Sequence, residues 1–265
     1  MKYYEDKDLS LKKDARGNYV KELQEELSKL GYPAGVVDGI FGPATEKAVK
    51  LLQQDTLVNG TVDFDLALRI HKRATKTTPT LSIEFIESPN QSLRRGQEIN
   101  LLVIHYTASG DLESTVRWFE NPTANASAHY VIGVDGKIVQ MVEEEKKAWH
   151  AGKSKWKGQE NCNNFSIGIE LVNWGILKKK GGQYLCWPKG YTAPYSGPEP
   201  VKASGKYWQP FSEEQYQTLI SLTKSIIGRH HIALSQIVGH CDIAPGRKVD
   251  PGPGFDWVRF KSNLV

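Results

Sequence analysis

Long apolar runs are missing from this 265-residue sequence. No stretch approaches the ~18 apolar residues that a membrane-spanning helix needs. The first residues, MKYYEDKDLSLKKD, also lack the apolar segment of a secretory signal. We therefore expect a protein that is synthesised in the cytoplasm without a signal peptide and has no integral membrane association.

Cysteine and strong charge are scarce as well. The three cysteines, Cys162, Cys186 and Cys241, form no CxxC pair and are too few for a disulfide framework, which favours buried thiols in a reducing compartment. The formal net charge of +4 is too weak to predict a nucleic-acid partner. A hydrophobic content of 39% and a charged content of 24% are typical of a globular protein.

The first 73 residues have helical periodicity. Apolar residues recur at helical spacing between Val20 and Leu30, and further helices are predicted at about 43–54 and 63–73. The connections DGIFGPAT and NGTVDFDL resemble each other, which indicates a weak internal repeat. We predict a small all-α three-helix domain at 1–73, followed by a polar linker at 74–80.

From residue 81 to 265 the pattern changes to strands interspersed with helices. Buried strands are predicted at 100–107 and 165–173, and alternating runs around the Asp-Gly turn of 127–142 predict a hairpin. A capping box at 212–215 opens a helix. This arrangement predicts an α/β fold with a mixed central β-sheet flanked by helices.

Residues 178–210 match neither pattern. The segment is too long for an ordinary connection and too rich in Tyr and Trp for a disordered linker. We predict an ordered insertion, which either forms one wall of a substrate cleft or packs on itself as a surface flap.

Two histidines and an aspartate are candidate metal ligands. His105 lies at the exit of a predicted strand, His240 ends a strand-like run, and Asp250 follows in the Gly/Pro-rich loop GHCDIAPGRKVDPG. Three such ligands leave a fourth position open on zinc, as in hydrolytic sites. The spacing does not join His105 to His240, and a single histidine is more often a hydrogen-bonded core or surface residue.

Glu170 and Lys248 have two interpretations each. Glu170 interrupts an apolar strand, so it is either a buried ion-pair partner or a general base whose pKa is raised by burial. Lys248 is either a surface lysine or a cation directed at a developing oxyanion.

Five motifs occur in order between about residues 87 and 260: IHYT, SAHYVI-x-x-DG-x-IVQ, AWHAG-x-S, NCNNFSIGIELVN and GHCDIAPGRKVDPGPGFDW. Together they resemble the type 2 N-acetylmuramoyl-L-alanine amidases, and most closely the AmpD-like branch of the peptidoglycan-recognition-protein superfamily. The resemblance implies Zn²⁺ held by His105, His240 and Asp250, with Glu170 as the catalytic acid and base and Lys248 as the oxyanion cation.

The same resemblance places three further residues in the substrate cleft: His129, Trp149 and His150. For Trp149, a packing role is the alternative. Related peptidoglycan-recognition proteins often have a tyrosine where this chain has Ala128, which leaves Glu170 as the base candidate.

The first 73 residues resemble three-helix peptidoglycan-binding domains through YVKELQEELSKLGY, DGIFGPAT and AVKLLQ. They depart from that pattern at Asp63, where a second glycine is common. The resemblance implies peptidoglycan as the partner.

The combined resemblance implies hydrolysis of the amide between N-acetylmuramic acid and L-alanine of the stem peptide. The architecture is similar to that of a modular phage endolysin, a monomer released from the cytoplasm to act on the peptidoglycan layer. The alternatives are a bacterial wall-remodelling or recycling amidase and a non-catalytic peptidoglycan-binding receptor.

Overall fold

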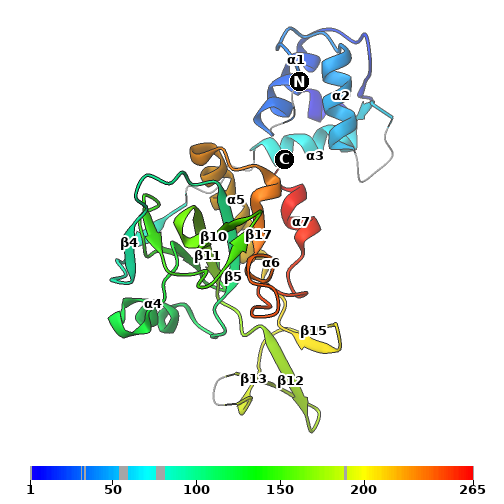
Figure 1. Ribbon diagram of the computed structural model, residues 1–265. Helices are drawn as coiled ribbons and strands as arrows, with labels where there is room; N and C mark the ends of the chain where they lie inside the picture. The colour runs from blue at the N-terminus through cyan, green and yellow to red at the C-terminus, as the bar shows by residue number, and fades with distance from the viewer. Residues whose placement is uncertain are drawn as a thin grey trace. The chain divides into compact units, whose positions relative to one another are not determined.

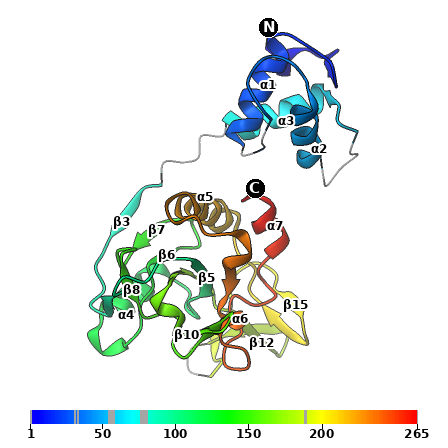
Figure 2. The same cartoon turned by 45° about the horizontal axis from the view of Figure 1, so that its top comes forward.

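The computed structural model describes residues 2–30, 32, 34–53, 59–75, 81–187 and 190–264. It divides into two compact units, 1–80 and 81–264, which are described separately below (Figures 1 and 2). Most of the predicted linker, 76–80, lies outside the described residues. Within the described part of the chain, no helix is long and apolar enough to cross a membrane.

The first unit contains the three predicted helices, α1 (Asn18–Lys29), α2 (Pro43–Leu52) and α3 (Phe64–Thr75). A short 3₁₀ turn, η1 (Tyr3–Glu5), and the strand pair β1 (Ser10–Leu11) and β2 (Val62–Asp63) complete it. Its separate core includes Val20, Leu23 and Leu27 of α1. The structure therefore confirms the three helices that the periodicity predicted.

The predicted internal repeat has a structural basis in two buried glutamines. The Gln24 side chain accepts the Gly39 N–H and donates to Asp38. In the same way, Gln53 accepts the Gly60 N–H and donates to Asn59. Each glutamine fixes one Asx-Gly turn whose glycine has a positive φ, at +76° and +70°.

The second unit is built on the predicted mixed sheet, which has six strands in the order β17-β5-β11-β6-β7-β3. The strands are β3 (Ile83–Phe85), β5 (Leu101–Tyr106), β6 (Tyr130–Ile132), β7 (Ile138–Gln140), β11 (Ser166–Leu171) and β17 (Ile237–Gly239). β5 pairs in parallel with both β11 and β17, whereas β6 and β7 form the predicted antiparallel hairpin. Two short pairs lie outside this sheet: β4 (Gln91–Leu93) with β8 (Lys146–Ala148), and β9 (Lys155–Trp156) with β10 (Gln159–Glu160).

Strand alternation separates the two faces of β5 and β11. Leu102, Ile104, Ile167 and Ile169 share a core with α5 (Glu213–His230), which begins at the predicted capping box. The opposite face carries Leu101, Val103 and His105 from β5, and Ser166, Gly168 and Glu170 from β11. Three further helices complete the unit: α4 (Leu112–Glu120), α6 (His240–Ile243) and α7 (Trp257–Ser262).

A buried carboxylate joins the segment after β7 to the end of α5. Glu144 accepts hydrogen bonds from the Tyr130 hydroxyl at 2.8 Å, from Arg229 Nη2 at 2.6 Å and from His230 Nε2 at 2.6 Å. Burial alone raises the pKa of Glu144, but these hydrogen bonds outweigh burial and lower the pKa to about 2. The charge is therefore compensated inside the fold.

The predicted insertion is an ordered five-stranded sheet of order β14-β13-β12-β16-β15. Its strands are β12 (Ile176–Lys180), β13 (Gln183–Cys186), β14 (Ala193–Pro194), β15 (Val201–Ala203) and β16 (Lys206–Trp208), and β12 and β13 project beyond the main sheet in Figure 1. Trp208 packs closely against Gly252 at the base of this sheet, because a Cβ at Gly252 would lie 2.4 Å from the indole ring.

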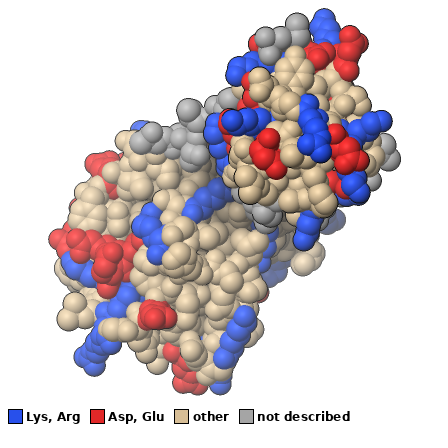
Figure 3. Space-filling view, turned by 90° about the horizontal axis from the view of Figure 1, so that it is seen from above, with Lys and Arg blue, Asp and Glu red and all other residues tan. Residues whose placement is uncertain are grey.

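On the surface shown in Figure 3, acidic and basic side chains are interspersed.

Candidate active site

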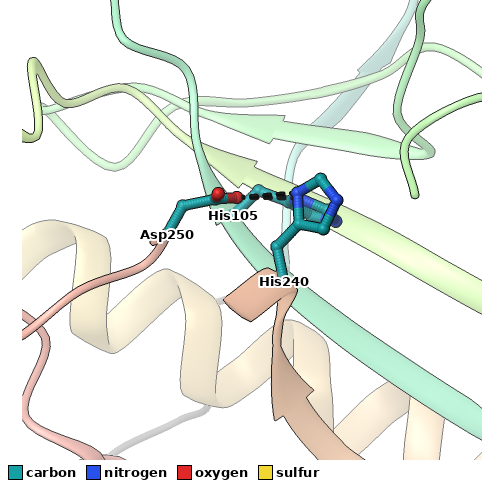
Figure 4. A group of neighbouring side chains, drawn as sticks. All are labelled: His105, His240 and Asp250. Atoms are coloured by element: carbon teal, nitrogen blue, oxygen red, sulfur yellow. Dashed lines mark hydrogen bonds and ion pairs between the residues drawn. The ribbon is translucent and has the colours of Figure 1, made fainter. Parts of the chain in front are cut away.

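Three side chains converge where the carboxyl ends of two parallel strands meet. His105 is in β5, and His240 begins α6 directly after β17, whose Gly239 pairs with Ile104. Asp250 reaches the same point from the following loop (Figure 4). His105 Nδ1 and His240 Nδ1 are 2.9 Å apart, and Asp250 Oδ2 lies 3.1 Å and 3.0 Å from them. The sheet topology thus joins the residues that sequence spacing could not join.

The chemistry of this group fits a divalent metal ion. All three residues are buried, and one ligand atom from each lies within 4.8 Å of the others. His240 Nε2 is 3.1 Å from the Ala151 carbonyl oxygen, which only accepts, so Nε2 carries the proton and Nδ1 is left as an acceptor. Burial lowers the pKa of His105 to about 4, which keeps that ring neutral. Nitrogen lone pairs and a carboxylate that face one another are suited to hold a metal cation between them.

Glu170 lies beside this group, because its position in β11 pairs with His105 in β5. The residue is partly buried, and its Oε2 is shielded from solvent without a hydrogen-bond partner. Burial, followed by the charge of Asp250, raises the pKa of Glu170 to about 8. An unpartnered carboxylate with a raised pKa is suited to accept and return a proton near neutral pH.

A cleft of about 420 Å³ opens over these groups. It is lined by Glu170, His240 and residues of five segments: 106–109, 114–119 of α4, 126–127, 149–150, and 247–250, which include Lys248 and Asp250. Lys248 is exposed at this cleft. The sequence reasoning assigned no site residue to α4, yet its Trp118 lines the cleft with a side chain that is 54% exposed. The sequence signal for this residue was a tryptophan on a short amphipathic helix, which could have been assigned to the site.

Models of known protein families match both units of the chain. The family model for N-acetylmuramoyl-L-alanine amidase matches residues 95–253, which include every candidate residue above. The chain belongs to this amidase family. A second family model, for a putative peptidoglycan binding domain, matches residues 16–63 of the first unit.

Members of the amidase family that are similar to this chain include AmiD and AmpD. N-acetylmuramoyl-L-alanine amidase AmiD of Escherichia coli (strain K12) is 38% identical over 182 residues, which cover 66% of this chain and 56% of that protein. The chain therefore spans little more than half of that relative's length. A crystal structure of a selenomethionine derivative of AmpD has a TM-score of 0.54 at 30% identity, covering 71% of this chain and 97% of that one. The E. coli AmiD complex with anhydro-N-acetylmuramic acid-L-Ala-D-gamma-Glu-L-Lys has a TM-score of 0.51 at 36% identity, covering 68% and 61%.

Two of the three residues predicted to lie in the cleft, Trp149 and His150, line it in this member of the amidase family. His129, by contrast, is fully buried: its Nδ1 accepts the Gly168 N–H at 3.0 Å, and its Nε2 lies 3.1 Å from the Lys146 carbonyl. The structure does not bring His129 to the cleft, and its contact with substrate stays a prediction.

The insertion is also separate from this cleft. None of its described residues between 178 and 210 is among the residues that line the cleft. Its aromatic side chains pack on one another instead: the Tyr184 and Tyr207 rings are 5.1 Å apart, and Lys179 Nζ lies over both. This packing favours the self-packed alternative over a wall of the cleft.

Proposed function

We propose that this chain is a zinc-dependent N-acetylmuramoyl-L-alanine amidase, which hydrolyses the amide between N-acetylmuramic acid and L-alanine in peptidoglycan. The observation that carries the proposal is the convergence of His105, His240 and Asp250 beside a cleft that is lined by His240, Asp250 and Glu170. Two imidazoles and one carboxylate are ligands typical of a catalytic zinc site. The substrate class is the one named for the AmiD complex.

In this proposal His105, His240 and Asp250 would hold a zinc ion. When bound, zinc supplies Lewis-acid polarisation and makes a water molecule more acidic. Glu170, which lines the cleft, takes the proton of the attacking water, and its raised pKa makes it a stronger base than an ordinary carboxylate. Lys248 stabilises the negative charge that develops on the lactyl carbonyl oxygen, and Glu170 then protonates the leaving amine.

The first unit supplies the second part of the proposal. We assign 1–73 to a peptidoglycan-binding domain, 74–80 to a linker and 81–265 to the catalytic domain, with peptidoglycan as the common partner. A wall-binding module raises the local concentration of bonds to be cut. This pairing fits a modular endolysin that acts on the peptidoglycan layer, and it has less use in an enzyme that recycles small fragments.

Purified sacculi test the activity. Incubation with the zinc-loaded protein should release free stem peptides with an L-alanine amino terminus, as identified by mass spectrometry. Chelation should stop the release, zinc should restore it, and His240→Ala should be inactive. The matched control is His231→Asn, which changes an exposed histidine whose left-handed backbone asparagine tolerates. Binding to sacculi without peptide release would establish a receptor instead.

A further inference from the structure

A chain of buried hydrogen bonds leads from the main chain to the metal-ligand candidate His105. The Ser166 Oγ lies 2.6 Å from the Cys162 carbonyl oxygen and 3.0 Å from His150 Nε2. The other nitrogen of that ring, His150 Nδ1, lies 2.9 Å from His105 Nε2. Ser166 is completely buried, and His150 and His105 are 8% and 1% exposed.

The direction of each hydrogen bond follows from the carbonyl at its end. A carbonyl only accepts, so the single hydroxyl proton of Ser166 is donated to Cys162. Ser166 must then accept from His150, which places the His150 proton on Nε2 and leaves Nδ1 as an acceptor. The His105 proton therefore lies on Nε2, and the lone pair of its Nδ1 faces His240 and Asp250.

Strand β11 leaves space for the His150 ring that takes part in these hydrogen bonds. A Cβ at Gly168 would lie 2.4 Å from Cγ of that ring, so only glycine leaves room for it in β11. The Asn163 side chain accepts the backbone N–H groups of His150 and Ala151 at 3.2 Å and 2.7 Å. These hydrogen bonds fix the loop at residues 150 and 151. The Ala151 carbonyl of this loop accepts from His240 Nε2 and so leaves Nδ1 of that ring unprotonated.

We propose that His150 and Ser166 are positioning residues that lock His105 in the tautomer presenting Nδ1 to a metal ion. Both nitrogens of His150 are engaged in this lock, so neither is free to bind a substrate. The proposal rests on the metal site of the proposed function. Partners that hold a ligating histidine in this way typically contribute about 10- to 100-fold to metal affinity.

Zinc affinity, measured by competition with a chelator, tests the lock without reference to turnover. His150→Leu removes the acceptor and should weaken zinc binding about 10- to 100-fold. His150→Asn places an amide oxygen near the position of Nδ1, so it should restore most of the affinity. Ser166→Ala should also weaken binding, because His150 then loses the acceptor that fixes its tautomer. Ser88→Ala, which removes a buried hydroxyl that donates to the Phe119 carbonyl and has no partner in this hydrogen-bond chain, is the matched control.

Nuclear magnetic resonance provides a direct readout on the metal-free, ¹⁵N-labelled protein. Long-range ¹H–¹⁵N correlations should show His105 and His150 protonated at Nε2 in the wild type, and a mixture of tautomers in Ser166→Ala. A His105 ring protonated at Nδ1, or equal zinc affinities for His150→Leu, His150→Asn and the wild type, would overturn the lock. A wild-type protein with the expected tautomers that binds no zinc would refute the proposed function and leave the hydrogen-bond chain intact.

Discussion

Replacing Glu170 with glutamine should have two effects of opposite sign. The amide keeps the size of the side chain but cannot take a proton, so turnover on muropeptides should fall roughly 10²- to 10⁴-fold with zinc still bound. The same change should stabilise the metal-free folded protein near neutral pH, because it removes a carboxylate whose charged form is disfavoured by burial. A residue retained for its chemistry at the expense of stability has this pattern.

The stability gain follows from the pKa of Glu170. The folded-state pKa is about 8, whereas the ordinary value is 4.5. Between these values the unfolded chain has lost the proton and the folded chain retains it, so stability falls as pH rises through this range. At pH 7 the difference of about 2.5 units corresponds to ~3.4 kcal/mol. Glu170 is partly exposed, so we discount the expected gain to ~1–3 kcal/mol.

Denaturant unfolding of the chelated proteins measures this gain. The difference in the free energy of unfolding between Glu170→Gln and wild type should be close to zero near pH 4 and should grow up to about pH 8. Glu160→Gln, at an exposed surface pair, is the matched control and should show little pH-dependent difference. A gain that does not change with pH would refute the raised pKa, and a variant with nearly full turnover would refute Glu170 as the base.

Three further predictions concern other parts of the chain. Lys248→Ala should lower turnover about 10²- to 10³-fold with unchanged zinc stoichiometry, and normal kcat would remove it from the oxyanion site. Glu144→Gln should destabilise the protein by roughly 3 kcal/mol at pH 7; because the folded-state pKa of Glu144 is lowered to about 2, this difference should shrink as pH falls from about 4.5 toward 2, as unfolding titrations can test. Deleting residues 1–78 should weaken binding to sacculi while soluble muropeptides are cleaved nearly as fast; an equal loss on both substrates would mean that the helical unit supports the catalytic fold.

Local patterns in the sequence predicted several main elements of the fold. Leu101, Val103 and His105 share one face of the predicted strand at 100–107, because neighbouring residues of a strand point to opposite sides. The capping box at Ser212 predicted the start of α5, and the Asp-Gly turn predicted the hairpin of β6 and β7. These signals depend on residues close together in the chain.

For the insertion and for His129, local patterns did not predict which side chains reach the cleft. The aromatic composition of 178–210 predicted order but not whether its rings faced the cleft or one another. His129 was assigned to the cleft by resemblance, whereas the structure buries it and its Nδ1 accepts the Gly168 N–H of β11. Burial is a property of the packed fold and has no signature in a single strand.

The sequence by itself determined which residue types were available for the chemistry: two histidines, an aspartate, Glu170 and a lysine in motifs of one amidase family. Tertiary structure decided how they meet. β17 lies beside β5 in parallel, so His240 comes within 2.9 Å of His105 although 135 residues separate them. The register of β11 against β5 likewise sets Ser166, Gly168 and Glu170 on the face of His105. Hydrogen bonding between strands distant in the chain fixed both placements, and no local spacing encodes it.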